Sequence, residues 1–161
     1  QPMVMEDAHL KTSQDIADKV TKSLGGSGIW GVEFFIGKEG VYFSELSPRP
    51  HDTGMVTLAG TQNFTEFELH ARAILGIPVL DIPLVRNGAS AVVLAEKENS
   101  TFPTFTGLSE AAQFSNTDFK IFGKPITRPF RRMAIALAHG TENTTELVEK
   151  AKVVAAKIKV S

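Results

Sequence analysis

Apolar side chains recur at helical spacing in three stretches of the chain. In the first, Ile16, Val20 and Leu24 lie four residues apart and predict a helix from Thr12 to Leu24. Thr12 or Ser13 offers a hydroxyl group that caps its N-terminus, and the two glycines that follow Leu24 end it.

The second stretch begins with a capping-box pattern, in which Thr65 is followed three residues later by Glu68. The helix is expected to end at Gly76, two residues before a proline. Its inward face is predicted to consist of the apolar residues Phe67, Ala71, Ile74 and Leu75.

The third stretch predicts a C-terminal helix from about Thr144 to Ile158, with Asn143 and Glu146 at its cap. Its buried stripe is expected to be Leu147, Ala151, Val154, Ala155 and Ile158.

Runs of β-branched and aromatic residues predict strands elsewhere. Two such runs flank the turn Gly37-Lys38-Glu39-Gly40 and predict a β-hairpin with a three-residue loop closed by a left-handed Gly40. Further strands are expected at 89–95, 119–122 and 132–138, with an edge strand or loop at 102–106 and a short helix at 107–112.

The composition changes at residues 77–83, which contain two prolines. We therefore expect an α+β protein with two domains, 1–76 and 77–161. The second would be a small β-rich domain closed by the C-terminal helix.

Composition limits the classes of function. The 161 residues carry a net charge of −1, which gives no general reason to expect nucleic acid or an acidic membrane as partner. There is no cysteine, so disulfides and thiolate metal sites are excluded. No apolar run approaches the roughly 20 residues of a membrane span.

The two strands of the hairpin each carry one carboxylate. A loop centred on Glu39 places Glu33 opposite Glu45, with Cβ atoms roughly 4.5–5.5 Å apart. Two such charges repel by about 4 kcal/mol at a separation of about 4 Å and an effective dielectric constant of about 20. Oxygen ligands without a nearby thiolate suit Mg²⁺ or Mn²⁺, so we expect a magnesium–nucleotide site. The alternative is that either glutamate points into solvent.

A stiff polar loop, Ser47–Gly54, follows directly. Pro48 and Pro50 hold Arg49 in an extended conformation between them. Arg49, His51, Asp52 and Thr53 offer polar groups for a charged ligand. An ordinary proline-rich connection would explain the prolines but not this density of charge.

A basic cluster lies at and between the predicted strands 119–122 and 132–138. Lys124, Arg131 and Arg132 fall within nine residues, in a chain whose charge is otherwise balanced. Arginine binds phosphate through two parallel hydrogen bonds and lysine acts as a point charge, so the cluster suits a phosphate monoester. The alternative is a solvated turn.

Residues 33–54 resemble the carboxylate-bearing end of an ATP-grasp fold. The segment Ser44–Thr57 is similar to the formate-dependent phosphoribosylglycinamide formyltransferases of purine biosynthesis. The resemblance extends through 67–78 and 122–132, and it covers only the C-terminal part of that enzyme. It implies that residues 1–76 form the C-terminal portion of an ATP-grasp domain, an antiparallel sheet with helices.

The family implies a role for each candidate residue. Glu33 and Glu45 would bind the Mg²⁺ that bridges the phosphates of the co-substrate ATP. Substrate-binding residues for glycinamide ribonucleotide would be Asp52, Lys124, Arg131 and Arg132, and Arg49 would assist at an acyl phosphate. In the family, formate attacks the γ-phosphate of ATP to give formyl phosphate, and the glycinamide amine then takes the formyl group.

The resemblance also carries expectations about the whole protein. It implies a cytoplasmic homodimer that binds formate, ATP and glycinamide ribonucleotide. Because the chain starts at Gln1 and lacks the segments that hold adenine and the triphosphate, we expect it to be an inactive fragment.

Two alternatives remain. The related carboxyaminoimidazole ribonucleotide synthases also carry a Pro-Arg-Pro-His loop, but they typically continue it with Asn-Ser-Gly, where this chain has Asp52-Thr53-Gly54. They also usually have Asn-Glu in place of Ser44-Glu45. The other alternative is a non-catalytic module that binds a phosphorylated ligand or serves in dimerisation.

Overall fold

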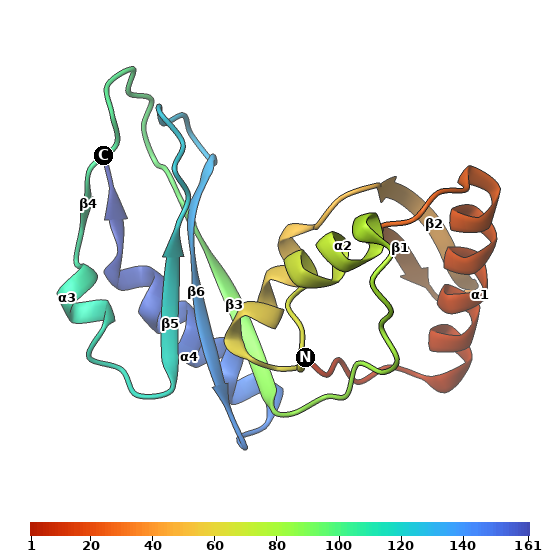
Figure 1. Cartoon of the computed structure of the whole chain (residues 1–161). Coiled ribbons are helices and arrows are strands. Elements are labelled where there is room, and N and C mark those ends of the chain that lie inside the picture. Colours follow the sequence, from red (N-terminus) through yellow and green to blue (C-terminus); the bar gives the residue numbers. More distant parts are fainter. The chain divides into compact units, whose positions relative to one another are not determined.

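The computed structural model describes all residues, 1–161, and divides them into two compact units. The hairpin unit comprises Met3–Met55 and Phe64–Ile82, and the sheet unit comprises Gln1–Pro2, Val56–Asn63 and Pro83–Ser161. Figure 1 shows the elements of both units in chain order. The chain passes into the sheet unit for the last time within the predicted boundary segment 77–83, although residues 56–63 also belong to the sheet unit.

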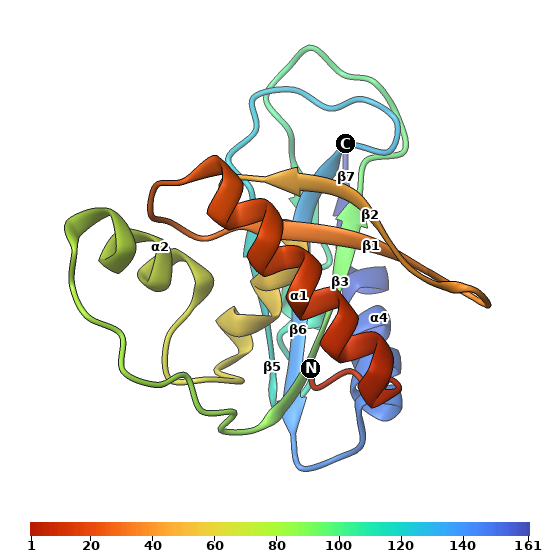
Figure 2. The same ribbon diagram turned by 90° about the vertical axis from the view of Figure 1, so that its right-hand side faces the viewer.

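The hairpin unit is built from two helices and two strands: α1 (Asp7–Leu24), β1 (Gly31–Gly37), β2 (Gly40–Ser47) and α2 (Glu66–Leu75). Helix α1 packs against both strands of the hairpin, as Figure 2 shows. A 3-10 helix, η1 (Asp52–Ala59), begins in this unit and continues into the other one.

The hairpin reaches the predicted pairing by a different route. Its turn has two residues, since Gly37 pairs directly with Gly40. A bulge in β2 then shifts the register between Phe34 and Glu33, so that Glu33 pairs with Glu45. The predicted three-residue loop is therefore wrong, whereas the predicted pairing of the two carboxylates is confirmed.

Helix α1 begins at Asp7, so the predicted start at Thr12 is wrong. Thr12 and Ser13 lie inside the helix and do not cap it. Their hydroxyl groups donate instead to the carbonyl oxygens of Ala8 and His9, each at 2.8 Å. This back-bonding lets hydroxyl residues sit inside a helix, which the capping argument did not allow for.

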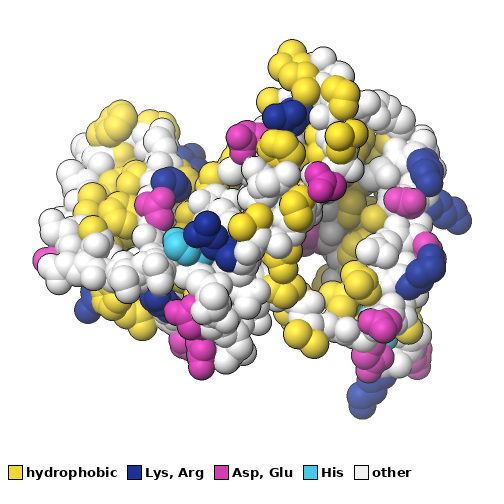
Figure 3. Space-filling view, turned by 60° about the horizontal axis from the view of Figure 1, so that its bottom comes forward, with side chains coloured by type: hydrophobic (Ala, Val, Ile, Leu, Met, Phe, Trp, Pro, Cys, Tyr) yellow, Lys and Arg dark blue, Asp and Glu magenta, His cyan; other side chains and the backbone are white.

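Helix α2 has the predicted capping box between Thr65 and Glu68, and it ends at Gly76 in a left-handed conformation. Its predicted inward face is wrong. Phe67, Ala71, Ile74 and Leu75 are exposed, while Glu66 at the start of the helix is buried. Figure 3 shows that hydrophobic side chains remain at the surface on the face of the molecule drawn there.

The sheet unit contains an antiparallel sheet in the order β3-β6-β5. Its strands are β3 (Asn87–Leu94), β5 (Thr117–Ile121) and β6 (Arg132–Gly140), close to the predicted ranges. A second sheet pairs β4 (Phe105–Thr106) with β7 (Lys159–Val160), and α3 (Leu108–Ala111) is the predicted short helix.

Helix α4 (Thr144–Lys157) closes the core of the sheet unit. It packs against β3 and β6 (Figure 1), and the Asn143 side chain caps it by accepting a hydrogen bond from Glu146 N. The predicted stripe is confirmed, with Leu147, Ala151 and Val154 fully buried against the alanine-rich strand β6. No helix of the protein is both long and apolar enough to cross a membrane.

Candidate functional site

Glu33 of β1 and Glu45 of β2 lie directly opposite each other, and both are exposed. The bulge after Phe43 brings Glu45 into this position, because without it Ser44 would pair with Glu33. Opposed positions of an antiparallel pair share a face of the sheet. The hairpin thus holds two carboxylates together on one face, with solvent access.

His51 lies beside the two carboxylates and contacts Glu33. Its Nε2 lies 2.9 Å from Glu33 Oε1, and its side chain is only 13% exposed. One potential metal-ligand atom from each of Glu33, Glu45 and His51, a carboxylate oxygen or a ring nitrogen, lies within 4.8 Å of the other two. A contact of 2.9 Å between ring nitrogen and carboxylate requires a proton on Nε2, whether the imidazole is neutral or charged. His51 therefore donates to Glu33 and restricts its orientation.

The other ring nitrogen of His51 is held by its own loop. Nδ1 lies 3.0 Å from Thr53 Oγ1 and 3.3 Å from Asp52 Oδ1. Asp52, the predicted substrate ligand, is thereby brought next to the carboxylate pair through His51. Arg49 is exposed, and its Nη1 donates to the carbonyl of Pro50 at 3.0 Å, so it stays within the loop.

Glu66 is a buried acidic residue beneath this loop. It is 4% exposed, and one carboxylate oxygen accepts a hydrogen bond from His51 N at 2.9 Å. Burial raises the pKa of Glu66 above its ordinary value of 4.5, while the hydrogen bond from His51 opposes that shift. Sequence reasoning missed this residue, because its position beside the capping box gave no signal of burial.

The basic cluster lies in the sheet unit, between β5 and β6. Lys124 Nζ donates to the backbone carbonyl of Arg132 at 2.6 Å, and Arg131 Nη1 donates to the carbonyl of Ile126 at 3.1 Å. Arg132 is exposed at the first position of β6. The structure therefore brings the three predicted cations together in one unit, while Glu33, Glu45, Asp52 and Arg49 belong to the other unit.

The donor set of the hairpin fits a hard divalent cation. Two opposed carboxylates supply negative charge and oxygen ligands, which Mg²⁺ prefers. The imidazole is already engaged with Glu33 and is a poorer ligand for Mg²⁺ than oxygen. We therefore assign His51 to the support of Glu33 and not to the metal.

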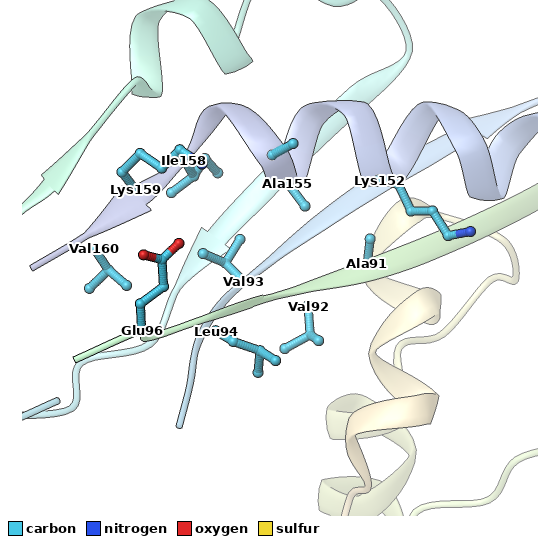
Figure 4. Close-up of a pocket in the computed structure, with 11 residues that line it drawn as sticks. Ala91, Val92, Val93, Leu94, Glu96, Lys152, Ala155, Ile158, Lys159 and Val160 are labelled. Carbon is cyan, nitrogen blue, oxygen red and sulfur yellow. The ribbon is translucent and has the colours of Figure 1, made fainter. Parts of the chain in front are cut away.

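The sheet unit also has a pocket of about 300 Å³ beside the edge strand β3. Residues of β3, α4 and β7 line it, mostly with apolar side chains, as Figure 4 shows. Glu96, Lys152 and Lys159 are its charged residues. None of the predicted site residues lines it.

Comparison with known proteins shows which families the chain resembles. The sequence model of the ATP-grasp domain family matches residues 1–67, and that of the family described as PurT, C-terminal, matches residues 88–158. The formate-dependent phosphoribosylglycinamide formyltransferase of Chlorobium phaeobacteroides is 60% identical over 96% of the chain, and that of Flavobacterium psychrophilum is 56% identical over all of it. The chain spans about 40% of the length of these relatives.

Solved structures of two enzymes resemble the chain over 99% of its length. N5-carboxyaminoimidazole ribonucleotide synthetase from Thermotoga maritima has a TM-score of 0.86 at 31% identity, and the chain covers 44% of it. The structure described as glycinamide-RNase-transformylase T from Mycobacterium tuberculosis has a TM-score of 0.79 at 32% identity, and the chain covers 40% of it. Structure alone therefore does not separate the two enzymes, whereas sequence identity favours the formyltransferases. We conclude that the chain belongs to the formate-dependent phosphoribosylglycinamide formyltransferase family of ATP-grasp proteins, of which it matches the C-terminal part.

Proposed function

We propose that the chain is part of an ATP- and formate-dependent ligase that formylates glycinamide ribonucleotide through formyl phosphate, in purine biosynthesis. The observation that carries the proposal is the opposed pair Glu33 and Glu45, with His51 bonded to one of them. Fold alone does not define a reaction, so the proposal depends on this site together with relatives that are 52–60% identical.

In this proposal Glu33 and Glu45 hold Mg²⁺. When bound, the ion would neutralise charge on the phosphates of ATP. His51 orients Glu33 by donating from Nε2, and the stiff loop holds Asp52 beside it. The hairpin thus presents two fixed carboxylates before any ligand arrives, so little reorganisation is needed on binding.

The remaining predicted residues are proposed to bind the nucleotide substrate. Asp52 would contact glycinamide ribonucleotide, and the cluster of Lys124, Arg131 and Arg132 would hold its phosphate. Arg49, exposed in the loop, would assist at the acyl phosphate.

Three properties of the whole protein complete the proposal. Residues 1–76 would be the C-terminal portion of an ATP-grasp domain and residues 77–161 a small separate domain. The protein would act as a homodimer. It would work in the cytoplasm, where ATP and purine intermediates are available.

The test is ADP release by the full-length protein that contains this chain. We expect release to require formate, glycinamide ribonucleotide and Mg²⁺ together. Absence of formate-dependent release would refute the proposed reaction.

The second candidate is a carboxyaminoimidazole ribonucleotide synthase, because a solved structure of such an enzyme matches the chain with a TM-score of 0.86. Replacing formate by bicarbonate and glycinamide ribonucleotide by the aminoimidazole nucleotide in the same assay separates the two reactions. A non-catalytic module that binds a phosphorylated ligand or serves in dimerisation would release no ADP under either condition.

A further inference from the structure

Glu66 occupies an unusual position for an acidic residue. It is 4% exposed, although the capping of α2 does not require it, because Thr65 and Glu68 form the capping box between them. Buried carboxylates are costly and are rarely found without a specific partner. The first turn of a helix partly offsets that cost, since its free N–H groups favour negative charge.

The partner of Glu66 is the backbone of the loop that carries the candidate site. His51 N donates to Glu66 Oε2 at 2.9 Å, across 15 positions in sequence. The loop also passes close to the carboxylate at Gly54, where an added Cβ would overlap Glu66 Oε2. The loop therefore folds around the Glu66 carboxylate, and a glycine is needed for the close approach.

The contacts continue from this backbone to the metal candidate. The His51 side chain lies against the start of β1, where a Cβ at Gly31 would be 2.8 Å from His51 Cβ. From there His51 Nε2 reaches Glu33 Oε1 at 2.9 Å. Glu66 thus connects to Glu33 through one hydrogen bond to the His51 backbone and one contact of the His51 ring.

We propose that Glu66 is a positioning residue, which fixes the His51–Gly54 loop and, through the His51 ring, the orientation of the Glu33 carboxylate at the metal site. This inference rests on the proposed function, in which Glu33 is a metal ligand. Groups that orient metal ligands typically change affinity by about 10–100-fold when they are removed.

The test compares three variants of the full-length protein. Glu66→Ala removes the acceptor for His51 N. Glu66→Gln keeps the volume and one amide oxygen that can accept the same hydrogen bond. Glu68→Gln is the matched control, because it changes an exposed glutamate in the same turn and glutamine also supports a capping box.

The first readout is equilibrium affinity for Mn²⁺ in the presence of ADP, measured by electron paramagnetic resonance. We expect about tenfold weaker binding or more for Glu66→Ala, less than about threefold for Glu66→Gln, and no change for Glu68→Gln. Wild-type affinity in a folded Glu66→Ala variant overturns the proposal. So does a Glu66→Gln variant that binds as weakly as Glu66→Ala, because the hydrogen bond would then not be the cause.

The second readout is hydrogen–deuterium exchange of the same proteins. Glu66→Ala should speed exchange in peptides covering residues 50–55 by about tenfold, while Glu66→Gln and Glu68→Gln leave it unchanged. Unchanged exchange in Glu66→Ala overturns the proposal. Neither readout requires turnover. If the wild-type protein transfers no formyl group, the proposed reaction is refuted, but these two measurements still decide the role of Glu66.

Discussion

Glu33 lies between two neighbours of opposite character. Glu45 faces it across the hairpin and repels it, whereas the His51 ring donates a hydrogen bond to it at 2.9 Å. The hydrogen bond from the His51 ring stabilises the charge on Glu33 only. His51 makes no such contact with Glu45, so a cation between the two carboxylates would still lower their mutual repulsion. The function of the pair is therefore best tested at Glu33.

We predict that Glu33→Gln raises the Mg²⁺ concentration for half-maximal ATP use by the full-length protein at least about tenfold. Mutation of a residue that only orients a metal ligand already weakens metal binding by about 10-fold or more, and loss of the ligand itself should have at least that effect. The free energy of unfolding should change by less than about 0.5 kcal/mol, because Glu33 is exposed. Magnesium titrations and urea unfolding measure the two quantities. Glu39→Gln in the turn of the same hairpin is the control, and an unchanged magnesium dependence in Glu33→Gln would rule out this ligand.

Gly54 gives a prediction about stability. An added methyl group would overlap the buried Glu66 carboxylate, so Gly54→Ala should lower the free energy of unfolding by about 1–3 kcal/mol. Gly123→Ala is the matched control, because an added Cβ at Gly123 meets nothing within 4 Å. Urea unfolding compares the two variants, and equal stabilities would show that the loop moves away from Glu66 at no cost.

At the scale of elements, the end of β6 contains a pH-sensitive contact. His139 lies beside Arg86, whose Nη1 is 3.3 Å from His139 Nδ1. Burial, and then the positive charges of Arg86 and Lys150, lower the pKa of His139 below its ordinary value of 6.5, and Glu142 and Asp118 oppose this shift. Protonation of His139 is thus less favourable in the folded state than in the unfolded state.

This shift predicts how stability depends on pH. The contribution of His139 is fully present above pH 6.5, and it is lost as the pH falls from there through the lowered pKa. We predict that His139→Gln loses less stability than the wild type between pH 7.5 and pH 5, measured by urea unfolding at each pH. His9→Gln is the control, and parallel curves for wild type and His139→Gln would contradict the assignment.

The helices also show where the spacing of apolar residues was sufficient to predict which face is buried. The stripe of α4 was predictable, because Leu147, Ala151 and Val154 recur at helical spacing and are buried against the sheet. The face of α2 was not, because the four residues predicted to face inward are exposed. Glu66 and His70 instead accept hydrogen bonds from the backbone N–H groups of His51 and Ile29. A hydrophobic pattern predicts burial only where a partner surface exists, and the sequence of α2 does not contain that information.

At the scale of the whole molecule, the chain spans about 40% of the length of its relatives. Its two predicted groups of site residues, the carboxylates and the basic cluster, belong to different compact units. Large apolar side chains of α2, such as Ile74 and Leu75, are exposed to solvent, and proteins usually bury such side chains against another segment or a partner.

We therefore predict that the 161-residue chain alone releases no ADP above background in the presence of ATP, formate, glycinamide ribonucleotide and Mg²⁺. Catalysis requires that all reactants be held in the correct geometry, and we expect this chain alone not to supply every group that holds them. The same assay on the full-length protein is the control. Turnover by the isolated chain would show that residues 1–161 suffice for the reaction.

The sequence by itself determined the hairpin, the capping box of α2 and the helix α4. These features depend on contacts within an element or across one turn, so residue type and spacing are enough to predict them. Even there the pairing of the carboxylates came from a bulge in β2 and not from the loop that was expected.

Only the tertiary structure decided the contacts of His51 with Glu33 and of Glu66 with the His51 backbone. These partners are 18 and 15 positions apart, on different elements, and their contact depends on how a loop folds back over a strand and a helix start. The physical reason is that burial of a polar group follows from the arrangement of the whole unit. A single carboxylate in a helical sequence gives no indication of which backbone group will reach it.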